Sequence, residues 1–202
     1  MGLPEIFISF QTAAVSVITR SARGVLAVAV KDATEGGAAE AAYKSLAEVP
    51  EDKFSPENYR LLKLVFLAAP TKVWVLRVGE DAEKTYQALE RLRFDWLAAP
   101  GLEDARVMSF IKTLRNGGRG VKAVVANATA PDCEGIVNLC VSGLTLEDGA
   151  MEAKDYAVRV AALLAALPLT RSATYVNLPE VVGCDALAEP DEAVDAGKLI
   201  IV

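Results

Sequence analysis

Three short stretches of the chain contain the residue types from which catalytic and ligand-binding sites are usually built. The first, RNGGRG at 115–120, is rich in glycine and arginine, as phosphate-binding loops are. Such loops bind phosphate through backbone N–H groups where a strand leads into the N-terminus of a helix. Here a helix pattern precedes the loop and a strand pattern follows it. The sequence therefore predicts a helix end and a turn, in which Arg119 could still bind an anion or an acidic partner.

The second stretch, NATAPDCEG at 127–135, follows a strand pattern, and α/β proteins bind ligands at such strand ends. It offers Asp132, Cys133 and Glu134. A cysteine nucleophile needs an activating partner such as histidine, and the chain contains 0 histidines. An ordinary loop is the favoured interpretation. The alternative is an α/β enzyme or small-ligand-binding domain with its site at the strand end near 126–134.

The third stretch, LEDGAMEAKD at 146–155, contains Glu147, Asp148, Glu152 and Asp155. Two carboxylates could in principle hold Mg²⁺, but acidic residues are also stabilised at the start of a helix. We expect a solvated, acid-rich helix start. No catalytic constellation assembles from the three stretches, so we expect no enzyme activity, no cofactor and no metal site.

Composition and charge narrow the class of protein further. The chain has 202 residues, of which 52% are hydrophobic, so it can bury the core of one domain or two small ones. Its net charge is −6 and its Lys and Arg residues are scattered, which disfavours nucleic-acid binding. No signal peptide and no apolar run of membrane-spanning length occurs, and the three cysteines match no metal-binding spacing. We expect a cytoplasmic protein that binds neither nucleic acid nor a membrane.

Strand and helix patterns alternate from residue 72 onward. Apolar, β-branched runs predict buried strands at 24–32, 72–78, 120–128 and 135–143, with a short strand in FDWLAAPG and a last one in KLIIV. Helices are expected after Ser55-Pro56, after Asp81, over 103–115 and over 151–167. This order predicts an α/β fold, a three-layer domain with a largely parallel or mixed sheet.

One strand pattern, at residues 5–11, has no partner nearby in the sequence. We expect an extended N-terminal β-arm and linker over 1–23, a small α+β segment over 24–80 and a central α/β domain over 81–202. The strand at 5–11 pairs either with another chain or with the edge of the sheet of its own chain.

The opening GLPEIFISFQTAAVSVITRSARGVLAVAVKD resembles the N-terminus of phage tail sheath proteins of the contractile type. The shared features are GLPEI.I.F, an alanine-rich step, RS.RG and a hydrophobic strand that ends in Lys-Asp. Similar later segments follow in order: YKSLAEVPEDKFSPENYRLLKLVFLAAPTKVWVLRV, FDWLAAPG, a helix with IK.LR, and DEAVDAGKLIIV. The likeness runs along nearly all of the chain. Family members continue into a C-terminal domain with an extended arm, and we expect this chain to be a portion that lacks that domain.

The resemblance implies a structural subunit of a phage or phage-like tail, made in the bacterial cytoplasm. Such subunits polymerise with copies of themselves as rings or a helix around a tail tube. The sheath contracts when the baseplate triggers it and drives the tube through a cell envelope. Terminal arms in such sheaths add strands to neighbouring subunits. The resemblance thus makes six arm residues candidates for an intersubunit interface: Ile6, Phe7, Ile8, Phe10, Arg20 and Arg23.

Overall fold

The computed structural model of the chain describes residues 24–127, 129, 131–168 and 170–201. The expected arm over 1–23 lies outside the described residues. Among the described residues, no helix has the length and apolar character needed to cross a membrane. The strands are β1 (Val25–Lys31), β2 (Glu40–Tyr43), β3 (Lys72–Val78), β4 (Trp96–Ala98), β5 (Lys122–Val125), β6 (Ile136–Cys140), β7 (Thr145–Leu146), β8 (Gly149–Ala150), β9 (Val181–Gly183) and β10 (Lys198–Ile200). The helices are α2 (Pro56–Phe66), α3 (Ala82–Arg91), α4 (Asp104–Asn116), α5 (Ala153–Ala166) and α6 (Pro190–Asp195), with short 3-10 turns at Leu46–Glu48 and Glu51–Lys53.

The main sheet has seven strands in the order β10-β6-β5-β4-β1-β3-β2. All neighbouring strands are parallel except β2, which runs antiparallel to β3. This confirms the α/β fold with a largely parallel sheet. Because β1 pairs with both β3 and β4, strand pairing crosses the division expected between 24–80 and 81–202. The division into two segments stays a prediction. Strands from both segments belong to the same sheet.

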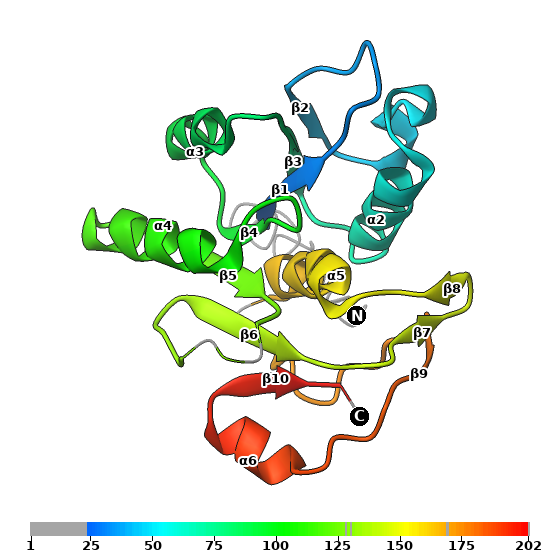
Figure 1. The fold of residues 1–202 in the computed structure, drawn as a ribbon, viewed down its shortest axis with the longest axis vertical. Helices are drawn as coiled ribbons and strands as arrows, with labels where there is room; N and C mark the ends of the chain where they lie inside the picture. Colours follow the sequence, from blue (N-terminus) through cyan, green and yellow to red (C-terminus); the bar gives the residue numbers. More distant parts are fainter. Residues whose placement is uncertain (1–23, 128, 130, 169, 202) are drawn as a thin grey trace, which may run out of the picture.

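Alternating residues of the strands supply two hydrophobic cores, one on each face of the sheet. Leu26 and Val28 of β1 pack with residues of α2 and α5, whereas Ala27 and Ala29 pack with residues of α3 and α4. The two pairs of helices therefore cover opposite faces, and Figure 1 shows the strands between them. This is the predicted three-layer arrangement.

The helix starts follow from local sequence signals. Ser55 precedes Pro56, and its hydroxyl accepts a hydrogen bond from the backbone N–H of Asn58 at 3.2 Å. The carboxylate of Asp81 accepts one from the backbone N–H of Glu83 at 3.0 Å. Both N-caps were predicted from the sequence, and the structure confirms them.

Helix α5 buries Tyr156 and Val160, but small residues make up much of the rest of its buried surface. Its fully buried positions include Ala157, Ala161 and Ala162, while Leu163 and Leu164 are only half-buried. Alanine lets α5 lie close to both the sheet and α2, so two elements cover it instead of one. The small sheet, in the order β8-β7-β9, has no counterpart in the sequence prediction.

Candidate functional site at the carboxyl edge of the sheet

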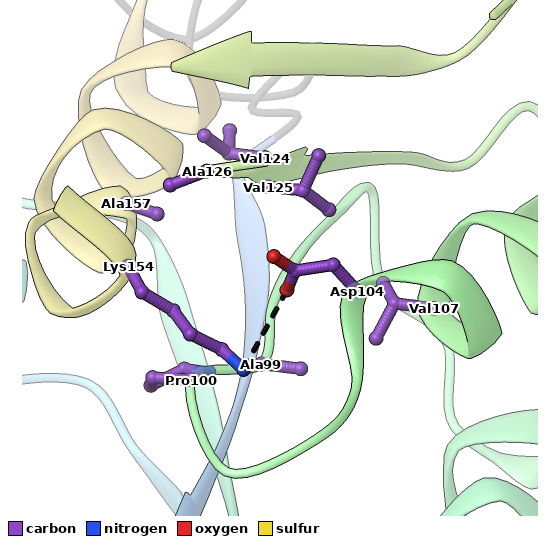
Figure 2. Close-up of a pocket in the computed structure, with 9 residues that line it drawn as sticks. All are labelled: Ala99, Pro100, Asp104, Val107, Val124, Val125, Ala126, Lys154 and Ala157. Carbon is purple, nitrogen blue, oxygen red and sulfur yellow. Dashed lines mark ion pairs between the residues drawn. The ribbon is translucent and has the colours of Figure 1, made fainter. Parts of the chain in front are cut away.

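The carboxyl ends of the parallel strands are where an α/β protein would bind a ligand. The crevice beyond β4 and β5 is lined by Ala99, Pro100, Asp104, Val107, Val124, Val125, Ala126, Lys154 and Ala157. Lys154 crosses it from α5, as Figure 2 shows, and its ammonium lies 3.7 Å from the Asp104 carboxylate. The same ammonium donates a hydrogen bond to the carbonyl of Leu102 at 2.6 Å. The crevice consequently has no room even for a water-sized sphere.

A second closure lies where the order of the strands reverses, between β1 and β4. The turn at Pro100-Gly101 packs on the end of β1, and the N–H of Gly101 donates to the carbonyl of Ala29 at 3.0 Å. A Cβ at position 101 would lie 2.7 Å from the backbone nitrogen of Lys31. The turn at 100–101 therefore packs directly on the end of β1, close to the position at which dinucleotide-binding folds hold a ligand.

The loop after β5 is held by polar contacts within the fold. The side chain of Asn138, which is buried, accepts from the N–H of Asn127 at 3.0 Å and donates to its carbonyl at 2.6 Å. Glu134 forms an ion pair with Arg115 of α4. Asp132, Cys133 and Glu134 do not line the crevice beyond β4 and β5, and Glu134 is engaged by Arg115.

The glycine-rich stretch is a helix end, as predicted. Gly117 caps α4, and Gly118 takes the left-handed conformation with a φ of +85° that glycine adopts readily. Arg119, the candidate for binding an anion, donates instead to the carbonyls of Glu90 and Leu92, at 2.8 and 2.6 Å. Its guanidinium also lies over the ring of Phe94, with 5.2 Å to the ring centroid. Arg119 thus joins α3, α4 and β4.

The acidic stretch at 146–155 forms β8 and the start of α5. Asp148 forms an ion pair of 2.5 Å with Arg60 of α2, which holds the pKa of Asp148 below its usual value. Burial and the neighbouring Glu152 carboxylate instead raise the pKa of Asp155. Within the described residues, no group of three or more His, Cys, Asp or Glu side chains is arranged to hold a metal ion.

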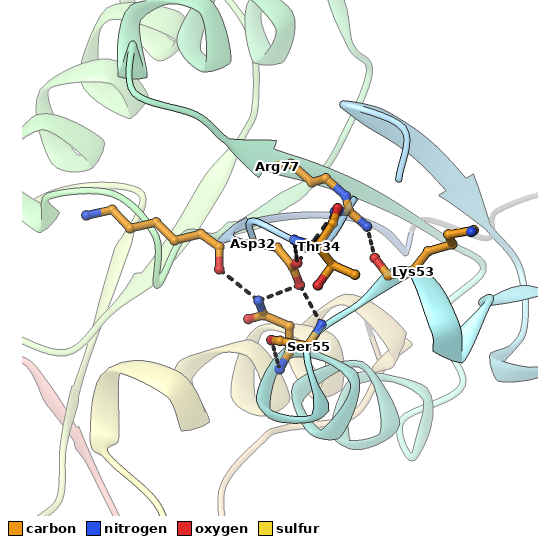
Figure 3. A network of polar contacts seen from close by, with 7 residues as sticks. Asp32, Thr34, Lys53, Ser55 and Arg77 are labelled. Carbon is orange, nitrogen blue, oxygen red and sulfur yellow. Dashed lines mark hydrogen bonds and ion pairs between the residues drawn. The ribbon is translucent and has the colours of Figure 1, made fainter. Parts of the chain in front are cut away.

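A buried polar network at the end of β1 was missed by the sequence reasoning. The side chain of Asp32 is 0% exposed, and it accepts hydrogen bonds from the backbone N–H groups of Thr34 and Ser55 at 2.9 and 3.0 Å. Figure 3 shows Arg77 of β3 next to Asp32. The Arg77 guanidinium lies 3.5 Å from the Asp32 carboxylate. Burial alone would raise the pKa of Asp32, but these hydrogen bonds outweigh burial and lower it. The signal in the sequence was the Lys-Asp pair that ends the first buried strand.

A second buried network joins α5 to the segment before β9. The Glu180 carboxylate accepts hydrogen bonds from the Tyr156 hydroxyl at 2.9 Å and from Nε of Arg159 at 2.5 Å. Burial opposes ionisation of Glu180, but the hydrogen bonds from Arg159, Tyr156 and the backbone, together with the Arg159 charge, outweigh burial and lower the pKa of Glu180. Burial and the Glu180 charge raise the pKa of Tyr156. Every donor and acceptor named here lies within the fold, so both networks hold elements together.

Comparison with known proteins identifies the relatives of the chain. No family model matches the sequence. A curated protein named tail sheath protein, from Clostridium phage phiCD119, is 32% identical over 219 residues, which covers 99% of this chain. The chain is thus similar to a tail sheath protein along almost its whole length. It spans 59% of the length of that sheath relative.

Solved sheath structures share the fold. The crystal structure of a sheath tail protein from Listeria innocua has a TM-score of 0.76 at 17% identity, covering 92% of this chain and 67% of the other. For the sheath tail protein of Desulfitobacterium hafniense the TM-score is 0.75 at 15% identity, covering 98% and 71%. A chain in the contracted helical sheath of the anti-feeding prophage matches with a TM-score of 0.63 at 11% identity, over 100% of this chain and 64% of the other. The α/β domain described above is thus the fold of sheath proteins.

Proposed function

We propose that this chain is part of a structural subunit of a contractile phage or phage-like tail sheath. The observation that carries the proposal is the 32% identity to a tail sheath protein along 99% of the chain. Copies of the subunit polymerise around the tail tube, and contraction of this sheath drives the tube through a cell envelope. The subunit works without catalysis and consumes no cofactor, because the energy is stored in the packing of the subunits.

The partners of the subunit are other copies of itself, the tail tube and the baseplate. Chains with this fold occur in the contracted helical sheath and in the baseplate structure of the anti-feeding prophage, which supports the first and third of these partners. The place of action is the tail of a virion or phage-like particle, assembled from subunits made in the bacterial cytoplasm. Neither nucleic acid nor a membrane is a partner.

The N-terminal arm is proposed to join neighbouring subunits by strand addition. Ile6, Ile8 and Phe10 would fill pockets of the neighbour, while backbone hydrogen bonds supply affinity. Arg20 and Arg23, in the linker, would form salt bridges to the same neighbour. The competing possibility is that residues 5–11 pair within their own chain, and β2 and β10, at the two edges of the sheet, are where such a strand would add.

Two experiments test the proposal. The protein is expressed at the full length of its open reading frame and imaged by negative-stain electron microscopy, where tubes or rings are expected. A uniform monomer under many conditions would count against the sheath function. Deletion of residues 1–20 is expected to leave a folded protein that no longer polymerises, whereas loss of folding would show that the arm pairs within its own chain.

A further inference from the structure

In this fold, acidic side chains gather at the carboxyl ends of the parallel strands and basic side chains at their amino ends. Each helix that follows a parallel strand runs back, so helix N-termini lie at the carboxyl edge of the sheet and helix C-termini at the amino edge. Acidic residues occupy the first turns of α2, α3, α4 and α5, and basic residues the last turns of α2, α3 and α4. Helix dipoles favour this placement, and it gives the two edges opposite charge.

At the carboxyl edge two hollows adjoin. One, of about 340 Å³, lies between α2, β8 and α5, and the other, of about 720 Å³, lies between the ends of β1 and β3 and the starts of α3 and α4. Lys31 and Gly101 line both, so together they form one groove. We call it the acidic groove, because its lining acids outnumber its lining bases: they are Glu57, Glu152 and Asp155 in the first hollow and Asp32, Glu80 and Glu103 in the second.

Asp32 is already paired with Arg77 and accepts backbone hydrogen bonds, but the exposed acids Glu57 and Glu152 are not neutralised within the described part of the chain. Two of its three cations are engaged elsewhere, because Arg60 pairs with Asp148 at 2.5 Å and Arg106 pairs with Glu83 at 2.7 Å. Among the described residues, none forms a hydrogen bond or ion pair with the side chain of Glu57 or Glu152, both of which are exposed. The groove therefore has uncompensated negative charge.

The opposite edge presents cations. Arg91 ends α3, Arg93 precedes β4 and Lys122 begins β5, and all three side chains are exposed. Two acids lie near these cations: Glu90, which precedes Arg91 and is exposed, and Asp95, which accepts hydrogen bonds from the N–H groups of Gly24 and Val25 at 2.9 and 3.1 Å. Three cations therefore face one exposed acid. We call Arg91, Arg93 and Lys122 the basic ridge.

We propose that the acidic groove of one copy docks on the basic ridge of a second copy, head to tail. The charges are complementary, and the two surfaces lie at opposite ends of the strands, so one copy can use both at once. Such a contact is heterologous, and repeating it builds a ring or an open helix. The inference rests on the proposed assembly function, and it names surfaces other than the N-terminal arm.

Two neutralised variants of the chain test this docking. One is Arg91→Gln with Arg93→Gln, which removes two of the three charges of the ridge, and the other is Glu57→Gln with Glu152→Gln, which removes charge from the groove. The first variant keeps its groove and the second keeps its ridge, so neither should bind another copy of itself. In a mixture, the groove of the first should bind the ridge of the second, and association should stop at a complex with one copy of each. Association is measured by sedimentation velocity at low salt and again at about 0.3 M salt, where exposed charges are screened.

The wild-type chain is expected to associate in a concentration-dependent way, and salt should reverse this. Each variant alone should bind itself at least about tenfold more weakly, and the mixture should give the 1:1 complex. Matched controls change the same number of charges elsewhere: Glu189→Gln with Glu192→Gln, and Lys53→Gln with Lys84→Gln. The docking is overturned if the wild type stays monomeric at low salt, if the variants self-associate as the wild type does, or if the controls weaken association equally.

The same variants separate this inference from the proposed function. The four substitutions at Glu57, Arg91, Arg93 and Glu152 are also introduced into the protein expressed at the full length of its open reading frame. If tubes or rings form equally well with and without them, the docking is overturned and the sheath function still stands. Absence of tubes for the unsubstituted protein would count against the sheath function itself. Circular dichroism of each variant checks that its fold is retained.

Discussion

The carboxylate of Asp32 accepts a hydrogen bond of 2.7 Å from the side-chain amide of Asn58, and this contact ties the end of β1 to the first turn of α2. The same amide donates to the carbonyl of Lys31 at 2.8 Å. Asp32 and Asn58 are both buried, so water does not compete for these groups. One carboxylate thus sets the relation of three elements, since Arg77 of β3 lies at its other oxygen.

Replacing Asp32 by Asn should destabilise the fold by about 3 kcal/mol. The substitution removes the charge next to Arg77 and turns one acceptor into a donor that faces the donor of Asn58. Urea denaturation followed by circular dichroism measures the effect. Asp52→Asn, at an exposed carboxylate whose ion pair among the described residues is with Lys53, is the control and should change stability by less than about 0.5 kcal/mol.

The contribution of Asp32 should also depend on pH. Because its folded-state pKa is lowered, the contribution is complete above the unfolded-state pKa of about 3.9 and is lost as pH falls toward the folded-state value. The free energy of unfolding of the wild type should therefore fall more steeply below about pH 4 than that of the Asp32→Asn variant. Equal slopes for the two proteins would contradict this assignment.

Gly101→Ala should destabilise the fold by about 2 kcal/mol, because a Cβ there would lie 2.7 Å from the nitrogen of Lys31 and 2.9 Å from the carbonyl carbon of Val30. Neither backbone atom can move without disturbing β1. Gly79→Ala is a matched control in the loop that follows β3, where a Cβ would meet nothing within 4 Å. Thermal unfolding of both variants checks this, and equal melting temperatures would show that the turn at 100–101 yields.

Removal of Glu180 alone should be much more harmful than removal of the whole ion pair. Glu180→Met leaves the buried Arg159 guanidinium without its partner, at a cost of about 3 kcal/mol. The double variant with Arg159→Met buries no charge and should lose less stability than the two single variants summed. A double-mutant cycle of denaturation free energies measures the coupling, and simple additivity would mean that the pair does not act as a unit.

Asp155→Asn should stabilise the fold near neutral pH. Its pKa is raised by burial and by Glu152, so ionisation of Asp155 weakens folding, and the cost is present above the folded-state pKa. The gain from asparagine should shrink as pH falls through the raised folded-state pKa and be absent below the unfolded-state pKa of about 3.9, where aspartic acid is protonated in both states. Stability curves against pH for the two proteins test the sign. A loss of stability at neutral pH would show that the carboxylate is needed in the fold.

Several elements could be read from the sequence because their causes are local. The N-caps at Ser55 and Asp81, the helix end at Gly117 and the buried strands all follow from residue types within a few positions. The candidate site near 126–134 could not be judged in that way. Whether it is open depends on Lys154, which reaches the crevice from a helix far along the chain.

Arg119 shows the same limit for a single residue. Its type and its glycine neighbours allowed it to bind an anion, but two carbonyls of the segment that ends α3 take up its guanidinium. No pattern around residue 119 records where Glu90 and Leu92 lie. The buried networks of Asp32 and Glu180 escaped prediction for the same reason, because their partners come from separate elements.

The sequence by itself determined the α/β class, the main helix starts and the likeness to tail sheath proteins, because hydrophobic periodicity, capping residues and the order of segments are all written along the chain. Only the tertiary structure decided that the crevice beyond β4 and β5 is closed, that Asp32 and Glu180 hold elements together, and that acidic and basic side chains gather at opposite edges of one sheet. Those properties depend on which distant residues meet. These distant residues come into contact because β1 pairs with β3 and β4 and because helices pack on both faces of the sheet.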